Sequence, residues 1–147
     1  MKKFRFPYEV SIVIPTYNNE ESLEIAIKSA AKSSYPILEI IVVDDGSKTK
    51  DSQLLVESIK KEIKIPLFYI RKKNGGPSSA RNEGINIARG DWIAFLDADD
   101  LMITNSIESK FQHLEQCKNI NKIAAIYGAF IWLSLIHISE PTRLWHI

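Results

Sequence analysis

Three carboxylates follow a short apolar run at residues 92–100, and these are the residues best suited to chemistry. The run reads Trp-Ile-Ala-Phe-Leu-Asp-Ala-Asp-Asp. Side chains of a strand alternate between its two faces, so on a buried strand Asp97 and Asp99 would point the same way at its carboxyl end. Carboxylate oxygens suit Mg²⁺ or Mn²⁺, and two of them leave coordination positions for phosphate oxygens. The pattern predicts a metal site, although Asp-Asp is also common in polar turns and helix caps.

Polar residues also follow three other apolar runs, and we expect all four sets to lie at one edge of a sheet. Runs rich in β-branched residues are typical of strands that are buried on both faces of a parallel sheet. Amphipathic segments separate the runs, which predicts an α/β fold: a doubly wound, mostly parallel sheet with helices on both faces. Ligands of such sheets bind at the carboxyl ends of the strands. The four expected strands are 10–15, 39–44, 67–71 and 92–97.

Apolar residues at helical spacing mark one face of each expected helix. Asn18, with Glu21 three residues later, is a variant of the capping box and predicts the start of the first helix. A further apolar run at 123–132 predicts a fifth strand. The expected faces are Leu23, Ile27, Ala30 and Ala31; Leu55, Ile59 and Ile63; Ala80, Gly84, Ile87 and Ala88; and, in a helix over 105–116, Ile107, Phe111 and Leu114.

The polar sets after the first three runs each allow two interpretations. Tyr17 either stacks on a base or packs against the protein. Asp-Asp-Gly-Ser at 44–47 is typical of a turn, but a carboxylate there would also accept a hydrogen bond from a nucleobase or ribose. The glycines of 74–77 form a flexible connection or let the backbone approach a phosphate. Arg81 faces a structural carboxylate or an anionic ligand.

Composition and charge exclude several classes of protein. The 147 residues, 45% of them hydrophobic, suffice for one domain or part of one. Nineteen basic and eighteen acidic residues without a basic stripe argue against a nucleic-acid partner. Cys117 is the only cysteine, which fits a reducing compartment. No leader-like apolar segment precedes Pro15, and the run at 123–138 is shorter than the roughly 20 residues of a membrane span. We expect a cytoplasmic protein, free or at the inner face of the membrane.

Four segments, in this order and spacing, resemble the donor half of family 2 glycosyltransferases. The resemblance covers residues 10–132 and implies a GT-A, Rossmann-like fold. It also implies a nucleotide-diphospho-sugar donor, usually a UDP-sugar, and an inverting transfer to a hydroxyl acceptor that the sequence does not identify. The segments are Ser-Ile-Val-Ile-Pro-Thr-Tyr-Asn at 11–18, Ile-Val-Val-Asp-Asp-Gly-Ser at 41–47, Asn-Gly-Gly-Pro-Ser-Ser-Ala-Arg-Asn-Glu-Gly at 74–84 and Phe-Leu-Asp-Ala-Asp-Asp at 95–100.

The resemblance implies roles for individual residues. Asp45, with Asp44 beside it, would contact the uracil. Asp97 and Asp99 match the D-x-D pair of the family, with Asp97 near the ribose or the metal and Asp99 on the metal itself. The implied cofactor is Mg²⁺ or Mn²⁺. The other residues that would line the nucleoside pocket or border the donor are Pro15, Thr16, Tyr17, Gly75, Gly76, Arg81 and Ala98.

The resemblance also implies boundaries along the chain. The general base of the family lies on a later strand and loop, so we expect residues 1–132 to be a truncated donor-binding domain without a catalytic base, inactive by itself. Residues 133–143 resemble the conceptual translation of an adapter used in sequencing libraries. We therefore expect 133–147 to be a non-native tail.

Three alternatives remain at this point. A receiver domain needs an acidic pair after its first strand and a phosphoacceptor aspartate after its third, whereas this chain has Pro-Thr-Tyr at 15–17 and Arg-Lys-Lys at 71–73. A dinucleotide-binding Rossmann domain is disfavoured because no G-x-G-x-x-G opens the first helix. A catalytically inactive module that binds a nucleotide sugar is compatible with every motif above.

Overall fold

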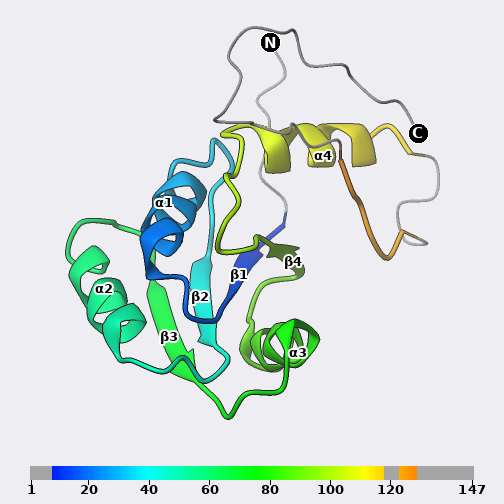
Figure 1. Cartoon of the computed structure of the whole chain (residues 1–147). Helices are drawn as coiled ribbons and strands as arrows, with labels where there is room; N and C mark the ends of the chain where they lie inside the picture. Colours follow the sequence, from blue (N-terminus) through cyan, green and yellow to red (C-terminus); the bar gives the residue numbers. More distant parts are fainter. Residues whose placement is uncertain (1–7, 118–122, 129–147) are drawn as a thin grey trace, which may run out of the picture. The chain divides into compact units, whose positions relative to one another are not determined.

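The computed structural model describes residues 8–117 and 123–128, and Figure 1 shows their arrangement. Each of the four expected strands forms, which confirms the α/β class. The elements in chain order are β1 (Val10–Thr16), α1 (Glu20–Ala31), β2 (Glu39–Asp44), α2 (Asp51–Ile59), β3 (Leu67–Arg71), α3 (Pro77–Ile87), β4 (Trp92–Phe95) and α4 (Ser106–Leu114).

The strands form one parallel sheet in the order β3-β2-β1-β4. The chain runs outward from β1 through β2 to β3, then returns to the other side of β1 to add β4. Crossovers between parallel strands are right-handed, so this reversal places α3 on the face opposite α1 and α2 (Figure 1). A doubly wound sheet binds ligands where its strand order reverses, outside the carboxyl ends of the strands. The topology therefore predicts a site between the ends of β1 and β4.

β1 and β2 are buried along their whole length because helices cover both of their faces. Under α3, the core consists of Val13, Ile41, Val43 and Ala80. Gly84 of α3 faces this core at very short range, since a Cβ atom there would lie 2.3 Å from Val13 Cγ1. The absence of a side chain thus lets α3 approach β1 closely, and α3 carries Arg81 toward the carboxyl end of the sheet.

Two of the expected strands differ from our predictions by more than one residue. β4 ends at Phe95, two residues short of the expected boundary, because its pairing with β1 ends where Val13 lies opposite Phe95. The expected strand at 123–132 is wrong for 123–128, which form no regular element. Its remaining residues lie outside the described part of the chain, as does the expected tail at 133–147.

Two expectations about the helices were also wrong. Asn18 does not cap α1: its φ is +47°, its amide donates to Ser47 Oγ (2.9 Å), and its side-chain oxygen accepts from the Lys48 amide (2.8 Å). Asn18 joins the loops after β1 and β2 instead. α2 ends at Ile59, so Ile63 lies beyond it, and its buried face comprises Ser52, Val56 and Ile59 rather than Leu55, Ile59 and Ile63.

Contacts group the chain into two compact units, Met1–Ser109 and Lys110–Ile147, and the sheet and its three covering helices lie in the first. α4 begins in the first unit and ends in the second. In the described part of the chain, every helix is too short or too polar to span a bilayer.

A buried carboxylate at the amino end of β2 anchors the connection between α3 and β4. Glu39 is 1% exposed and accepts hydrogen bonds from Ser11 Oγ (2.8 Å), the Arg89 amide (2.8 Å) and Arg89 Nε (2.8 Å). Burial raises the pKa of Glu39, but the donors of Arg89 and Ser11 outweigh that effect and hold the pKa below its ordinary value of 4.5. Glu39 therefore folds as a carboxylate.

Replacing Glu39 with glutamine is expected to destabilise the protein at neutral pH by about 2 kcal/mol, because charge-assisted hydrogen bonds are lost. A depressed folded-state pKa adds stability above pH 4.5 that is lost as the pH falls through the folded-state value. Wild-type stability should thus drop below pH 4.5, and Glu39→Gln should lack that part of the drop. Urea unfolding at pH 7 and at pH values below 4.5 measures both effects. Glu24→Gln, on an exposed helix face, is the control; equal pH slopes for all three proteins would contradict this role of Glu39.

Candidate functional site

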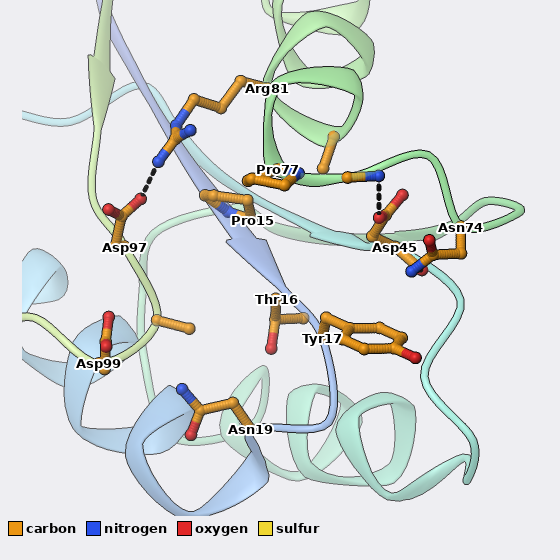
Figure 2. Close-up of a pocket in the computed structure, with 13 residues that line it drawn as sticks. Pro15, Thr16, Tyr17, Asn19, Asp45, Asn74, Pro77, Arg81, Asp97 and Asp99 are labelled. Carbon is orange, nitrogen blue, oxygen red and sulfur yellow. Dashed lines mark hydrogen bonds and ion pairs between the residues drawn. The ribbon is translucent and has the colours of Figure 1, made fainter.

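An open cleft of about 360 Å³ lies at the carboxyl end of the sheet, where the topology predicts it (Figure 2). Segments that are distant in sequence meet there: the end of β1, the loops after β2 and β3, the first turns of α3, and the turn after β4. The lining residues are Pro15, Thr16, Tyr17, Asn19, Asp45, Asn74, Gly76, Pro77, Ala80, Arg81, Asp97, Ala98 and Asp99. This set includes both D-x-D carboxylates and all of the expected donor-binding residues except Asp44 and Gly75.

Asp44 lies inside the fold and not in the cleft. It is 0% exposed, its Oδ1 accepts from the Ser47 amide (2.8 Å), and its Oδ2 accepts from the Tyr69 hydroxyl. Burial and the Asp44 carboxylate both raise the pKa of Tyr69 far above its usual value, so the hydroxyl remains a donor. The expectation that Asp44 lies beside Asp45 in the pocket is therefore corrected: Asp44 supports the loop after β2 from behind.

Four cleft residues were not singled out from the sequence: Asn19, Asn74, Pro77 and Ala80. Asn74 and Pro77 flank the glycine pair, so the glycine motif itself was the signal that could have identified them. Ala80 precedes Arg81 on α3. Asn19 belongs to the polar segment that follows the first strand, so its position at this edge of the sheet was expected, although no individual role was assigned to it.

The acidic end of the cleft is a turn and not the end of a strand. The Asp100 amide donates to the Asp97 carbonyl (3.0 Å), which closes the turn, and Arg81 donates to Asp97 Oδ1. Asp97 and Asp99 line the same wall through this turn, not through strand alternation (Figure 2). Partial desolvation of the carboxylate, followed by the negative charges of Asp99 and Asp97, raises the pKa of Asp100. The turn thus concentrates negative charge that a cation would offset.

The opposite end of the cleft is closed by Tyr17, Asp45 and Asn74 (Figure 2). Tyr17 is 47% exposed, so part of its ring is accessible to a stacking partner. Asp45 is 3% exposed and accepts hydrogen bonds from Lys72 Nζ (2.8 Å) and from the amides of Gly75 and Gly76 (3.0 and 2.7 Å). Gly75 itself does not line the cleft.

Thr16, between the two ends, has a buried hydroxyl oxygen without a hydrogen-bond partner among the described residues. Buried polar groups of folded proteins are nearly always paired, with the protein, with water or with a ligand. The cleft wall therefore contains a hydroxyl group that no described residue pairs, and water or a ligand can supply its partner.

Comparison with known proteins assigns the chain to a family. The sequence model of "Glycosyl transferase family 2" matches residues 11–134. The chain belongs to glycosyl transferase family 2. All four motif segments of the sequence lie within the matched residues, and their ends form the cleft. The family resemblance found in the sequence is thereby confirmed.

Relatives of this family 2 domain include longer proteins. An uncharacterized glycosyltransferase of Haemophilus influenzae is 34% identical over 86% of this chain and 48% of its own length. The minor teichoic acid biosynthesis protein GgaB of Bacillus subtilis is 34% identical over 86% of this chain and 14% of its own length. The crystal structure of S. aureus TarS 1-349 in complex with UDP-GlcNAc has a TM-score of 0.62 and 27% identity, covering 74% of this chain and 31% of that one. The chain spans about half of these relatives' length or less.

Membership in glycosyl transferase family 2 removes two of the alternatives considered from the sequence, the receiver domain and the dinucleotide-binding domain. It does not distinguish a transferase from an inactive binding module. That difference depends on the chemistry of the cleft.

The acidic turn of this family 2 domain fits a divalent cation. Asp97 and Asp99 offer hard oxygen donors, and Asp99 is exposed at the cleft wall. In the described residues, no group of three or more His, Cys, Asp or Glu side chains is arranged to hold a metal. A cation here would take its other ligands from water and from the bound molecule, as Mg²⁺ does at phosphate-binding sites.

Proposed function

We propose that this chain forms the donor-binding half of a glycosyltransferase that uses a nucleotide-diphospho-sugar, a UDP-sugar, with Mg²⁺ or Mn²⁺. The complete enzyme would transfer the sugar with inversion to a hydroxyl acceptor. One observation carries the proposal: a single cleft has a half-exposed aromatic ring and hydrogen-bonding groups at one end and two carboxylates at the other. A nucleoside diphosphate needs both environments in one cleft: a stacking and hydrogen-bonding surface for the nucleoside, and a cation site for the diphosphate.

The relatives support this donor class. S. aureus TarS 1-349 was crystallised with UDP-GlcNAc, and 74% of the present chain matches its fold. GgaB is described as a teichoic acid biosynthesis protein, which is consistent with transfer onto a glycoconjugate. Neither comparison identifies the acceptor of the present chain.

The chain's own residues would bind and orient the donor. Tyr17 would stack on the base, with Asp45 and Asn74 at the base edge. The Thr16 hydroxyl would find its missing partner in the donor or in an ordered water. Asp97 and Asp99 would hold the cation, which when bound neutralises the diphosphate leaving group. Arg81 would keep the Asp97 carboxylate in place through their ion pair. The proposal places no general base among the residues that the structure describes.

Binding of UDP is expected to require a divalent cation. Without one, the carboxylates of Asp97 and Asp99 repel the diphosphate, and the cation removes that repulsion. Titration calorimetry with UDP should show an affinity at least about tenfold higher, equivalent to about 1.4 kcal/mol, with Mn²⁺ than with a chelator. Uridine, which lacks the diphosphate, is the control and should bind equally in both conditions. Equal UDP binding with and without the cation would refute the metal role, and failure of both ligands to bind would refute the proposed function.

A further inference from the structure

Lys72 contacts the back of the cleft wall without lining the cleft. Its ammonium group lies 2.8 Å from Asp45 Oδ1 and 2.7 Å from the carbonyl oxygen of Lys73, and its side chain is only 19% exposed. A long, flexible lysine side chain is normally solvated, so this conformation is held by specific partners. The contact joins the loop after β3 to the loop after β2.

The two loops are interlocked around Asp45. The Asp45 carboxylate also accepts from the amides of Gly75 and Gly76, while its carbonyl accepts from Asn74 Nδ2 (3.0 Å). Three successive residues of the loop after β3 are thereby attached to one residue of the loop after β2. Two of these three, Asn74 and Gly76, line the cleft.

Two glycines leave the room that this arrangement needs. A Cβ atom on Gly75 would lie 3.1 Å from Lys72 Nζ and 2.8 Å from Ser79 Oγ. Gly46 has a φ of +80°, and a Cβ atom there would lie 2.9 Å from the Asn74 amide nitrogen. The close approach of the loops and the position of the ammonium group therefore both depend on the absence of side chains at these two positions.

The burial of Asp45 explains why a positively charged side chain is needed beside it. Asp45 is nearly completely buried, and burial of an uncompensated carboxylate is costly. Burial raises the pKa of Asp45, but Lys72 and the two glycine amides outweigh it and bring the pKa below its ordinary value. Without Lys72, the carboxylate would have to be neutralised or the loop would have to open to water.

We propose that Lys72 is a positioning residue: through Asp45 it holds the loop of residues 73–76 and thereby places Asn74 and Gly76 in the nucleoside end of the cleft. This inference rests on the proposed function, because the loop position matters to the protein only if a nucleoside binds there. Asp45 would then both line the cleft and anchor the loop of residues 73–76. Lys72 does not line the cleft, so it would act on the ligand through Asp45 and not by direct contact.

The test compares Lys72→Met with Lys73→Met, a matched control. Lys73 is the next residue, it is exposed, and its side chain makes no hydrogen bond or ion pair with the described part of the chain. Calorimetry with uridine, and with UDP plus Mn²⁺, should show that Lys72→Met weakens both ligands by the same factor, about tenfold. Lys73→Met should bind as the wild type does, and Lys72→Arg should recover part of the loss because it keeps the charge.

Two further readouts separate loop positioning from other roles. Hydrogen exchange without ligand should become faster at the Gly75 and Gly76 amides in Lys72→Met while the amides of β1 and β2 stay protected. The pH below which uridine binding weakens should also be higher in Lys72→Met, because Asp45 loses the neighbouring ammonium group and its pKa rises. Lys72→Gln serves as a second variant if Lys72→Met does not fold.

Several outcomes would overturn the inference. Weakening of UDP alone would mean that Lys72 contacts the phosphates directly. Wild-type affinity and unchanged amide exchange in Lys72→Met would mean that the loop is positioned without it. If the wild-type protein binds neither ligand, the proposed function fails, and Lys72 then positions no part of a nucleoside site.

Discussion

Replacing Asp99 with alanine is expected to abolish the metal-dependent part of UDP binding while leaving uridine affinity unchanged. Asp99 is exposed at the cleft wall, and the side chain of Asp97 is already engaged by Arg81. Asp99 is therefore the carboxylate with the most freedom to coordinate a cation. Losing it leaves one protein ligand, and we expect the affinity for UDP in Mn²⁺ to fall by about tenfold or more, which is the whole gain that the cation provides.

Asp100→Asn is the matched control for this experiment. Asp100 is the adjacent carboxylate and is also exposed, but it does not line the cleft. It should retain the response to Mn²⁺, so a general loss of negative charge is separated from loss of a ligand. Calorimetry with UDP and Mn²⁺, and with uridine alone, distinguishes the two variants. An Asp99→Ala protein that still binds UDP more tightly with Mn²⁺ would show that the cation is held elsewhere.

Replacing Gly84 with valine is expected to destabilise the fold by about 3 kcal/mol or more. A Cβ atom at this position already meets Val13 Cγ1 at 2.3 Å, and the two methyl groups of valine would enlarge the clash. Val13 is 0% exposed in the core of the sheet and has no room to yield. α3 would have to move away from β1, and the move would also displace Arg81 from Asp97.

Urea unfolding followed by circular dichroism measures this loss. Asn86→Val is the control, because it introduces the same residue at an exposed position of α3 and should cost less than about 1 kcal/mol. Combining Gly84→Val with Val13→Ala should recover part of the stability by opening space, as a double-mutant cycle would report. A Gly84→Val protein as stable as the Asn86→Val protein would contradict the packing argument.

Asp44 and Asp45 show where prediction from the sequence stopped. Both are aspartates at the end of one strand, and the motif gave them a shared role. In the structure, Asp44 bonds Ser47 and Tyr69 inside the fold, whereas Asp45 lines the cleft. Their separation depends on β3, which brings Tyr69 beside Asp44 from 25 residues away. A local pattern carries no information on such a partner.

The end of β4 and the start of α1 also could not be predicted from the local sequence. We expected the strand β4 to extend to Asp97, but its pairing with β1 ends at Phe95. The two carboxylates nevertheless share the cleft wall, because the Asp97 to Asp100 hydrogen bond turns the chain there. Similarly, Asn18 had the residue type of a helix cap, but contacts with Ser47 and Lys48 from the neighbouring loop hold it instead.

The sequence by itself determined the four strands, the parallel α/β class and the family, because hydrophobic periodicity and short motifs are local properties. It also placed the polar segments at one edge, since the carboxyl ends of parallel strands meet there. Only the tertiary structure decided which aspartate faces the cleft, which residues join the acidic turn, and that Lys72 supports the glycine loop. These features depend on burial and on partners distant in the chain, and both are fixed only when the strands pair and the helices pack on them.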